Sequence, residues 1–331
     1  MSMRRSRGAD PRPPSRVVGV CDLGTFSALI LIAQLRRGSP VALAEERHTV
    51  DLARGRDRYG ALSEAAICRA TRVLRRFDAL TRRFHCDATA AVGTAALRAA
   101  SGRSRLLRRL HVAGRHPVTV LSAPREAELA ALGARSGLPP STRSVPVVDV
   151  GGGSIEVVDP AGQLARGFRV GAATATVSWA AGSPRRRSER AAYFRRLAQR
   201  RLRRLVLLPR PSEGFIIGVG GTMATLAALA EGRGVFDPAA LHGKTLTAEW
   251  VNDVAETLAT LPTADIAAMI AFDPARARIL TAGTFLWAEV INRLCVRRVI
   301  VSVRGLRWGA AIRLVSGDLA SPTVRGRVEI T

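Results

Sequence analysis

The residues that could carry out chemistry centre on a glycine-rich turn between two extended segments. Residues 145–160 read Val-Pro-Val-Val-Asp-Val-Gly-Gly-Gly-Ser-Ile-Glu-Val-Val-Asp-Pro. The lead-in is apolar except for Asp149, which is typical of a buried strand with an acid near its end. The glycines let backbone N–H groups close around an anion, and Asp149 and Glu156 could hold a divalent cation against phosphate oxygens. A plain glycine-rich β-turn with two solvated acids is the alternative.

A second copy of this pattern lies near the N-terminus and favours the phosphate interpretation. Asp22-Leu-Gly-x-x-Ser27 matches Asp149-Val-Gly-x-x-Ser154 residue for residue. An apolar segment leads into each turn, and another leads out of it. Two such hairpins, about one small domain apart, predict a duplicated fold with a phosphate held between the halves.

A third glycine pattern follows a short apolar segment in the second half of the chain. A strand predicted over 214–218 closes on Gly218-Val-Gly-Gly-Thr222, and a helix is predicted over 223–231. The first N–H groups of a helix and its dipole attract anions. One such loop is weak evidence, but this is the third in the chain.

Two helical segments carry charged residues that suit phosphate chemistry. Arg98 falls on the first turn of a helix after a buried strand, where it could bind phosphate as a two-pronged donor. Glu126 and Glu128 fall in the early turns of a helix capped by Ser122, and one of them could accept a proton from an attacking water. A surface arginine, and acids that offset the helix dipole, are the alternatives.

The elements that must position these residues alternate in the way an α/β protein requires. Before the central turn, strands are predicted over 17–22, 28–34, 41–50, 87–92 and 118–121, with an amphipathic helix over 62–80. After the central turn, strands over 163–169 and 299–301 accompany helices over 186–207, 247–261 and 276–294. We therefore predict an N-terminal lobe over 17–123 and a C-terminal lobe over 124–315. A disordered basic tail over 1–16 precedes them, and a flexible tail over 316–331 follows them.

Length and apolar content bound the class of protein. The 331 residues are enough for two domains, and 47% of them are hydrophobic. No apolar run approaches the roughly 18–20 residues that span a bilayer, and the N-terminus lacks the apolar core of a secretory signal. These features predict a cytoplasmic protein with no membrane segment.

The formal net charge of +25 invites a polyanionic partner. Nearly all of the positive charge is arginine, since Lys244 is the only lysine, and a GC-rich coding sequence would give the same bias. The densest segment, 185–204, is predicted to be a helix with a basic face near a site for extended anions. Nucleic acid is not the expected partner, because aromatic residues make up 5% of the chain and no zinc spacing or nucleic-acid module is present.

Taken in order, these motifs resemble the exopolyphosphatase/guanosine-pentaphosphate phosphohydrolase (Ppx/GppA) family of the actin-like ATPase superfamily. The resemblance covers residues 17–315. The segments that carry it are Asp22 to Ser27, Gly93-Thr-Ala-Ala-Leu-Arg98, Ser122 to Glu128, Asp149-Val-Gly-Gly-Gly-Ser-Ile-Glu156, Gly218-Val-Gly-Gly-Thr222, His242-Gly-x-x-Leu-Thr247 and Ser302 to Gly309.

This resemblance implies an α/β fold of two actin-like (ribonuclease H-like) lobes, each with a mixed five-stranded sheet and flanking helices, around a cleft. It implies Mg²⁺ as cofactor, Glu126 as the general base and Arg98 as a phosphate ligand. The implied metal-binding acids are Asp22, Asp149 and Glu156. The implied phosphate-binding residues are Gly24, Thr25, Ser27, Gly151, Gly152, Gly153, Ser154, Gly220, Gly221 and Thr222.

Three segments depart from the family pattern. Phe26 stands where the first loop usually has Asn, and Val303 replaces the Asp of a Ser-Asp pair. Ala123, Pro124 and Arg125 replace the usual Gly-x-Glu before the catalytic Glu. Loss of one transition-state donor costs roughly 10²–10³ in rate, so these changes predict reduced activity or a different substrate.

The function predicted from these residues is Mg²⁺-dependent hydrolysis of a terminal phosphoanhydride. The substrate is inorganic polyphosphate or guanosine pentaphosphate, which the sequence does not distinguish. The alternative is a non-catalytic or weakly active sensor that binds polyphosphate or (p)ppGpp. An actin-like kinase ranks third, because such kinases lack the Glu-Ala-Glu context at 126–128. Members of the family are commonly dimers, so a homodimer is compatible with the resemblance.

Overall fold

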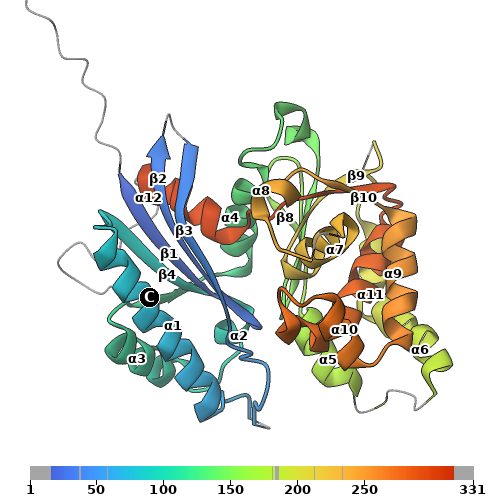
Figure 1. Cartoon of the computed structure of the whole chain (residues 1–331), viewed down its shortest axis with the longest axis horizontal. Coiled ribbons are helices and arrows are strands. Elements are labelled where there is room, and N and C mark those ends of the chain that lie inside the picture. The colour runs from blue at the N-terminus through green and yellow to red at the C-terminus, as the bar shows by residue number, and fades with distance from the viewer. Residues whose placement is uncertain are drawn as a thin grey trace, which may run out of the picture.

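The computed structural model describes residues 16–36, 39–57, 59–180, 182, 186–211, 213–232 and 234–316. Its described residues form two lobes, each built on a mixed sheet with helices on both faces (Figure 1). The predicted tails lie outside the described residues, apart from Arg16 and Ser316. None of the described helices combines the length and the apolar character needed to cross a bilayer.

The first lobe has a five-stranded sheet in the order β3-β2-β1-β4-β5. Its strands are β1 (Val17–Leu23), β2 (Ser27–Arg36), β3 (Ser39–Thr49), β4 (Ala88–Gly93) and β5 (Val118–Val120), and its helices are α1 (Glu64–Arg83), α2 (Ala95–Arg98) and α3 (Arg103–Gly114). Helix α1 forms as predicted, because Ser63 Oγ accepts a hydrogen bond from Ala66 N at 3.3 Å and a stripe of apolar residues packs on the sheet.

The second sheet has six strands in the order β10-β11-β9-β6-β7-β8, which corrects the prediction of five. Its strands are β6 (Val147–Val150), β7 (Ile155–Val158), β8 (Leu164–Phe168), β9 (Phe215–Val219), β10 (Thr245–Thr247) and β11 (Arg298–Val301). The additional strand, β10, is a three-residue edge strand that pairs antiparallel with β11. It was missed because so short a strand has too few residues to show an alternating pattern.

Helices α5 to α11 belong to the second lobe. Their bounds are α5 (Ala172–Ala180), α6 (Arg187–Arg201), α7 (Gly221–Glu231), α8 (Pro238–Leu241), α9 (Ala248–Thr260), α10 (Thr263–Met269) and α11 (Ala277–Arg293). Three 3-10 turns accompany the helices, at Pro140–Ser144, Arg203–Leu207 and Pro274–Arg276. The basic helix is shorter than the predicted 186–207. It ends at Arg201, and a 3-10 turn then buries Leu205 beside it.

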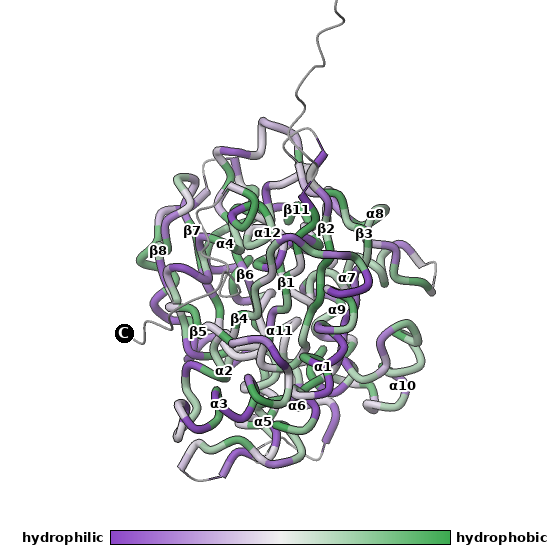
Figure 2. The backbone as a smooth tube through the Cα atoms, turned by 90° about the vertical axis from the view of Figure 1, so that its left-hand side faces the viewer, coloured by the Kyte–Doolittle hydropathy of each residue, from purple (hydrophilic) through white to green (hydrophobic). Residues whose placement is uncertain are grey.

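The duplication predicted from the two glycine turns is present in the strand pairing. Strand β1 runs antiparallel to β2 and parallel to β4, and β6 runs antiparallel to β7 and parallel to β9. Asp22 and Asp149 therefore lie near the carboxyl ends of equivalent strands. In Figure 2 the hydrophobic colour is concentrated along strands such as β2, whereas α3 carries hydrophilic stretches.

The last helix, α12 (Leu306–Ser316), returns to the first lobe, although the predicted division placed it in the second. Leu306, Trp308 and Leu314 pack with Val18 and Leu31 on the face of the first sheet that α1 leaves free. Helix α4 (Ala123–Arg135) lies beside α12, and its other side covers the second sheet (Figure 1). These two helices form the packed layer that joins the lobes.

Candidate active site

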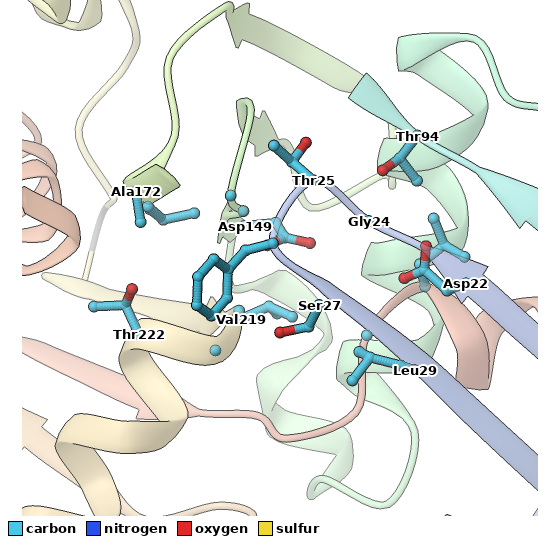
Figure 3. A pocket seen from close by; sticks show the side chains of 18 of the residues that line it. Asp22, Gly24, Thr25, Ser27, Leu29, Thr94, Asp149, Ala172, Val219 and Thr222 are labelled. Carbon is cyan, nitrogen blue, oxygen red and sulfur yellow. The ribbon is translucent and has the colours of Figure 1, made fainter. Parts of the chain in front are cut away.

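A pocket lies between the two lobes, where the three glycine turns converge. Of the thirteen predicted residues that line it, ten belong to the turns and three are acids: Asp22, Gly24, Thr25, Ser27, Glu126, Asp149, Gly151, Gly152, Gly153, Ser154, Gly220, Gly221 and Thr222. Figure 3 shows Asp22 and Thr94 on one side of this pocket and Ala172 and Thr222 on the other. Of the predicted site residues, Arg98 and Glu156 do not line it.

The first two turns belong to different lobes and touch each other. Gly24 N donates to Ser27 O at 3.1 Å, and Gly151 N donates to Ser154 O at 3.0 Å, so each turn is closed by the same hydrogen bond. A Cβ at Gly152 would lie 3.0 Å from Phe26 N, and one at Gly153 would clash with Thr25 Oγ1. Glycine is required here by the close approach of the two lobes.

The third turn leads from β9 into α7. Gly220 has a φ of +104°, which favours glycine, and a Cβ there would lie 3.1 Å from Asp149 Oδ1. The N-terminus of α7, at Gly221, faces the same pocket and offers its N–H groups to an anion.

An arginine that the sequence analysis did not single out covers this third turn. Arg276 is 4% exposed, and its guanidinium occupies the space that a Cβ at Gly221 would need. It pairs with Asp273 at 3.0 Å, and its Nη2 donates to Ser27 Oγ at 3.2 Å, so it joins turns from both lobes. Arg47 and Arg307 also line the pocket. The only sequence signal for Arg276 is a charged residue at the start of a long apolar helix.

Four carboxylates, three that line the pocket and one beside it, influence one another. Burial, together with the charge of Glu126, raises the pKa of Asp22 to about 8 and that of Asp149 to about 7. Burial, then Glu126 and Asp149, raises the pKa of Glu156 well above its ordinary value. Glu156 lies opposite Asp149 in the β6–β7 hairpin and is 3% exposed. Such a cluster repels itself unless a cation or protons neutralise it.

Glu126 forms an ion pair with Arg98, which brings α2 and the start of α4 together. Arg98 Nη1 also donates to Leu121 O at 3.0 Å. Burial raises the pKa of Glu126, and Arg98 acts against that rise. Glu128 has a different environment, since it pairs with Arg125 at 2.6 Å and with Arg313 at 3.1 Å and does not line the pocket.

The donor set fits Mg²⁺ in part. Asp22 Oδ1 is buried and has no hydrogen-bond partner among the described residues, as expected for an oxygen reserved for a ligand. No three His, Cys, Asp or Glu side chains of the described residues are grouped to hold a metal alone. Mg²⁺ commonly uses one or two carboxylates together with water and substrate phosphates, and Asp22 and Asp149 supply that number.

Comparison with known proteins identifies the family of this chain. The sequence model of the Ppx/GppA phosphatase family matches residues 31–316. The chain belongs to this family. It is 28% identical over 313 residues to exopolyphosphatase 2 of Mycobacterium tuberculosis, covering 90% of this chain and 98% of that protein. The resemblance seen in the motifs is therefore confirmed.

Solved structures of the family share the fold. A crystal structure of the Aquifex aeolicus family member superposes with a TM-score of 0.76 at 26% identity, covering 93% of this chain and 100% of that one. An exopolyphosphatase structure from Cytophaga hutchinsonii gives a TM-score of 0.81 at 23% identity, covering 91% and 98% of the two chains. The predicted α/β fold of two actin-like lobes is thereby confirmed.

The departures from the family pattern have distinct structural settings. Phe26 is 3% exposed and packs with Ala172, Ala173 and Ile279 of the second lobe, so the ring closes the lobes on each other at one side of the pocket. The Arg276 guanidinium lies 5.5 Å from its ring centroid. Arg125 points to Glu128, and Val303 lines the pocket without adding a polar group.

Proposed function

We propose that this protein is a Mg²⁺-dependent exopolyphosphatase that releases the terminal phosphate of inorganic polyphosphate, with Glu126 as general base. The observation that carries the proposal is the position of Glu126. It lines the same pocket as three turns whose N–H groups can surround a phosphate, and Asp22 and Asp149 lie beside it. The exopolyphosphatase names of relatives support the choice of substrate.

The reaction follows from this arrangement. Glu126 orients a water molecule and accepts its proton while the water oxygen bonds to the terminal phosphorus. The bridging P–O bond breaks, and the shortened chain leaves with the electron pair. The turn N–H groups hold the phosphoryl oxygens as charge moves between them, which stabilises the transition state mainly by position.

The remaining residues assist Glu126 and the phosphate. Arg98 keeps Glu126 in one orientation and lowers the pKa of its carboxyl against the effect of burial. Bound Mg²⁺, held by Asp22 and Asp149 with Glu156 behind them, would neutralise charge on the phosphoryl oxygens. Arg276 and the N-terminus of α7 line the same pocket and place positive charge there.

The test is phosphate release from tripolyphosphate, long-chain polyphosphate, guanosine pentaphosphate and ATP, each with Mg²⁺ and with chelator. We expect release from both polyphosphates with Mg²⁺ and loss of release with chelator. Faster turnover of guanosine pentaphosphate than of either polyphosphate would contradict the proposed substrate. Rates that stay the same in chelator would contradict the proposed requirement for Mg²⁺.

A sensor that binds without hydrolysis is the second candidate, and the position of Phe26 favours it. The ring fills space between the lobes where the family has a polar side chain. Tight binding of tripolyphosphate with no phosphate release under any of these conditions would establish the sensor in place of the enzyme.

A further inference from the structure

A second hollow lies on the second lobe and shares no residue with the pocket between the lobes. Apart from Gly167 and Phe168, all of its lining residues are arginines: Arg166, Arg169, Arg200, Arg201, Arg203 and Arg204. Its volume of about 350 Å³ falls within the usual range of ligand sites, roughly 300–1,000 Å³. Arg166 lies on the edge strand β8 and Arg169 directly follows that strand, whereas the other four come from the end of α6 and the 3-10 turn after it.

Apolar packing brings these two elements together. Leu202 and Leu205 are fully buried in the core of the second lobe, and Phe168 packs against the same cluster. The arginines on either side of the leucines are exposed. The core thus fixes the backbone that presents the cations, so their convergence does not depend on the cations themselves.

These arginines lack the acidic partners that some other arginines of the same lobe have. Arg195, earlier on α6, pairs with Glu256, and Arg293 on α11 pairs with Glu289. None of the six arginine side chains of the hollow forms an ion pair or hydrogen bond with any residue that the structure describes. Arg166 Nε is moreover buried without a partner in this part of the chain. Cations that converge without acids repel one another, and a bound polyanion removes that cost.

A short segment connects this hollow to the phosphate-binding turn of the second lobe. Arg169 is two residues from Gly171, and two residues of backbone span at most about 7 Å. A Cβ at Gly171 would lie 2.5 Å from both Gly151 O and Gly153 N, and Ala172 N donates to Gly151 O at 2.9 Å. The arginine hollow therefore begins beside the back of the turn that lines the pocket.

We propose that the hollow is an anchoring site for a distal part of a polyphosphate chain whose end occupies the pocket. The inference rests on the proposed function and adds a second binding site to it. A chain held at two sites binds its second site at high effective concentration, so the anchor strengthens binding of long chains and leaves short ones unaffected. Each phosphate of the chain is an anion that an arginine can bind with two N–H groups.

The test compares long-chain polyphosphate with tripolyphosphate, which is too short to reach both sites. The anchor variant carries Arg200→Gln, Arg203→Gln and Arg204→Gln, all exposed and outside the pocket. The control variant carries Arg72→Gln, Arg105→Gln and Arg108→Gln, which remove the same charge from the exposed surface of the first lobe.

For the anchor variant we expect KM for long chains to rise about tenfold or more, with kcat unchanged and with tripolyphosphate kinetics unaffected. The control variant should behave as the wild type. An equal KM increase in the anchor and control variants would overturn the proposal, and so would an equal KM increase for long chains and tripolyphosphate. An unchanged KM of the anchor variant for long chains would overturn it as well.

A direct measurement of polyphosphate binding distinguishes an error in the anchor proposal from an error in the proposed function. If the wild type releases no phosphate from either substrate, the hydrolase is wrong. Weaker binding of labelled long-chain polyphosphate by the anchor variant than by the control variant would then still support the anchor. Tighter wild-type binding of single-stranded RNA than of polyphosphate in the same assay would overturn the assignment of the ligand.

Discussion

At the scale of single residues, the site is defined by buried acids whose charge the fold does not neutralise. Asp22 and Asp149 are surrounded by protein and by Glu126, and the pKa of each is raised mainly by burial. The metal-free protein therefore holds protons on these groups at pH values where the unfolded chain has released them. Binding of a cation and protonation are alternative ways to reduce the same repulsion.

This account predicts how Asp22→Asn changes stability. The pKa of Asp22 is raised from 3.8 to about 8, so its contribution to stability is fully present below pH 3.8 and is lost as pH rises towards 8. Without Mg²⁺, the variant should therefore melt above the wild type at pH 8, by about 5 °C, with a smaller difference at pH 5. Thermal unfolding in chelator at both pH values measures this. A variant that melts below the wild type at pH 8 would show that the buried charge is not destabilising.

A second prediction concerns the partner of the proposed base. Arg98 lowers the pKa of Glu126, so Arg98→Gln should raise it and move the acidic limb of the kcat/KM profile for tripolyphosphate to higher pH. We also expect kcat to fall by about 10² because the carboxylate loses its orientation. Arg125→Gln is the matched control, since Arg125 pairs with Glu128 outside the pocket. If the acidic limb of the profile stays at the same pH in the Arg98 variant, then Arg98 does not control the pKa of the base.

At the scale of elements, the decisive contact is the crossing of α4 and α12. Gly133 and Gly309 let the helices approach so closely that a Cβ at Gly133 would lie 2.7 Å from Gly309 N. A Cβ at Gly309 would clash with Leu129 O. Because α4 also carries Glu126, this crossing sets the depth at which the proposed base enters the pocket.

Gly309→Ala should therefore lower the free energy of unfolding by about 3 kcal/mol, the upper end of the usual cost of overpacking. Gly167→Ala is the control. Gly167 is exposed on the edge strand β8, and the nearest atom to a Cβ there would be in the Leu164 side chain, 3.9 Å away. Urea unfolding of both variants gives the comparison. Equal stability of the two would mean that the helices can separate at little cost.

At the scale of the whole molecule, ion pairs and one aromatic ring hold the lobes around the pocket. Arg47 of β3 pairs with Asp273 at 3.2 Å, and Arg278 of α11 pairs with Asp51 at 2.9 Å. Phe26 packs against Ala172 and Ala173 of α5, and the Arg278 guanidinium lies 5.8 Å from its ring centroid. The two ion pairs join segments more than 200 residues apart, so the pocket closes only when both lobes have folded and packed together.

The sequence predicted the local parts of this arrangement and missed the parts made by long-range packing. The three glycine turns were predictable because each is a short pattern whose backbone geometry needs glycine. Arg276 was not, because its role arises only where α11 meets Ser27 of the other lobe. The return of α12 to the first sheet was missed for the same reason, since an apolar helix face does not reveal which sheet it covers.

The central claim is that both lobes hold a phosphate so that Glu126 can activate water against it. The most direct measurement is the rate of phosphate release from tripolyphosphate by Glu126→Gln, with the binding constant for tripolyphosphate measured on the same protein and Glu128→Gln as control. The account predicts that Glu126→Gln binds normally but is slower by about 10²–10⁴, whereas Glu128→Gln retains its rate. Wild-type turnover in Glu126→Gln would contradict it.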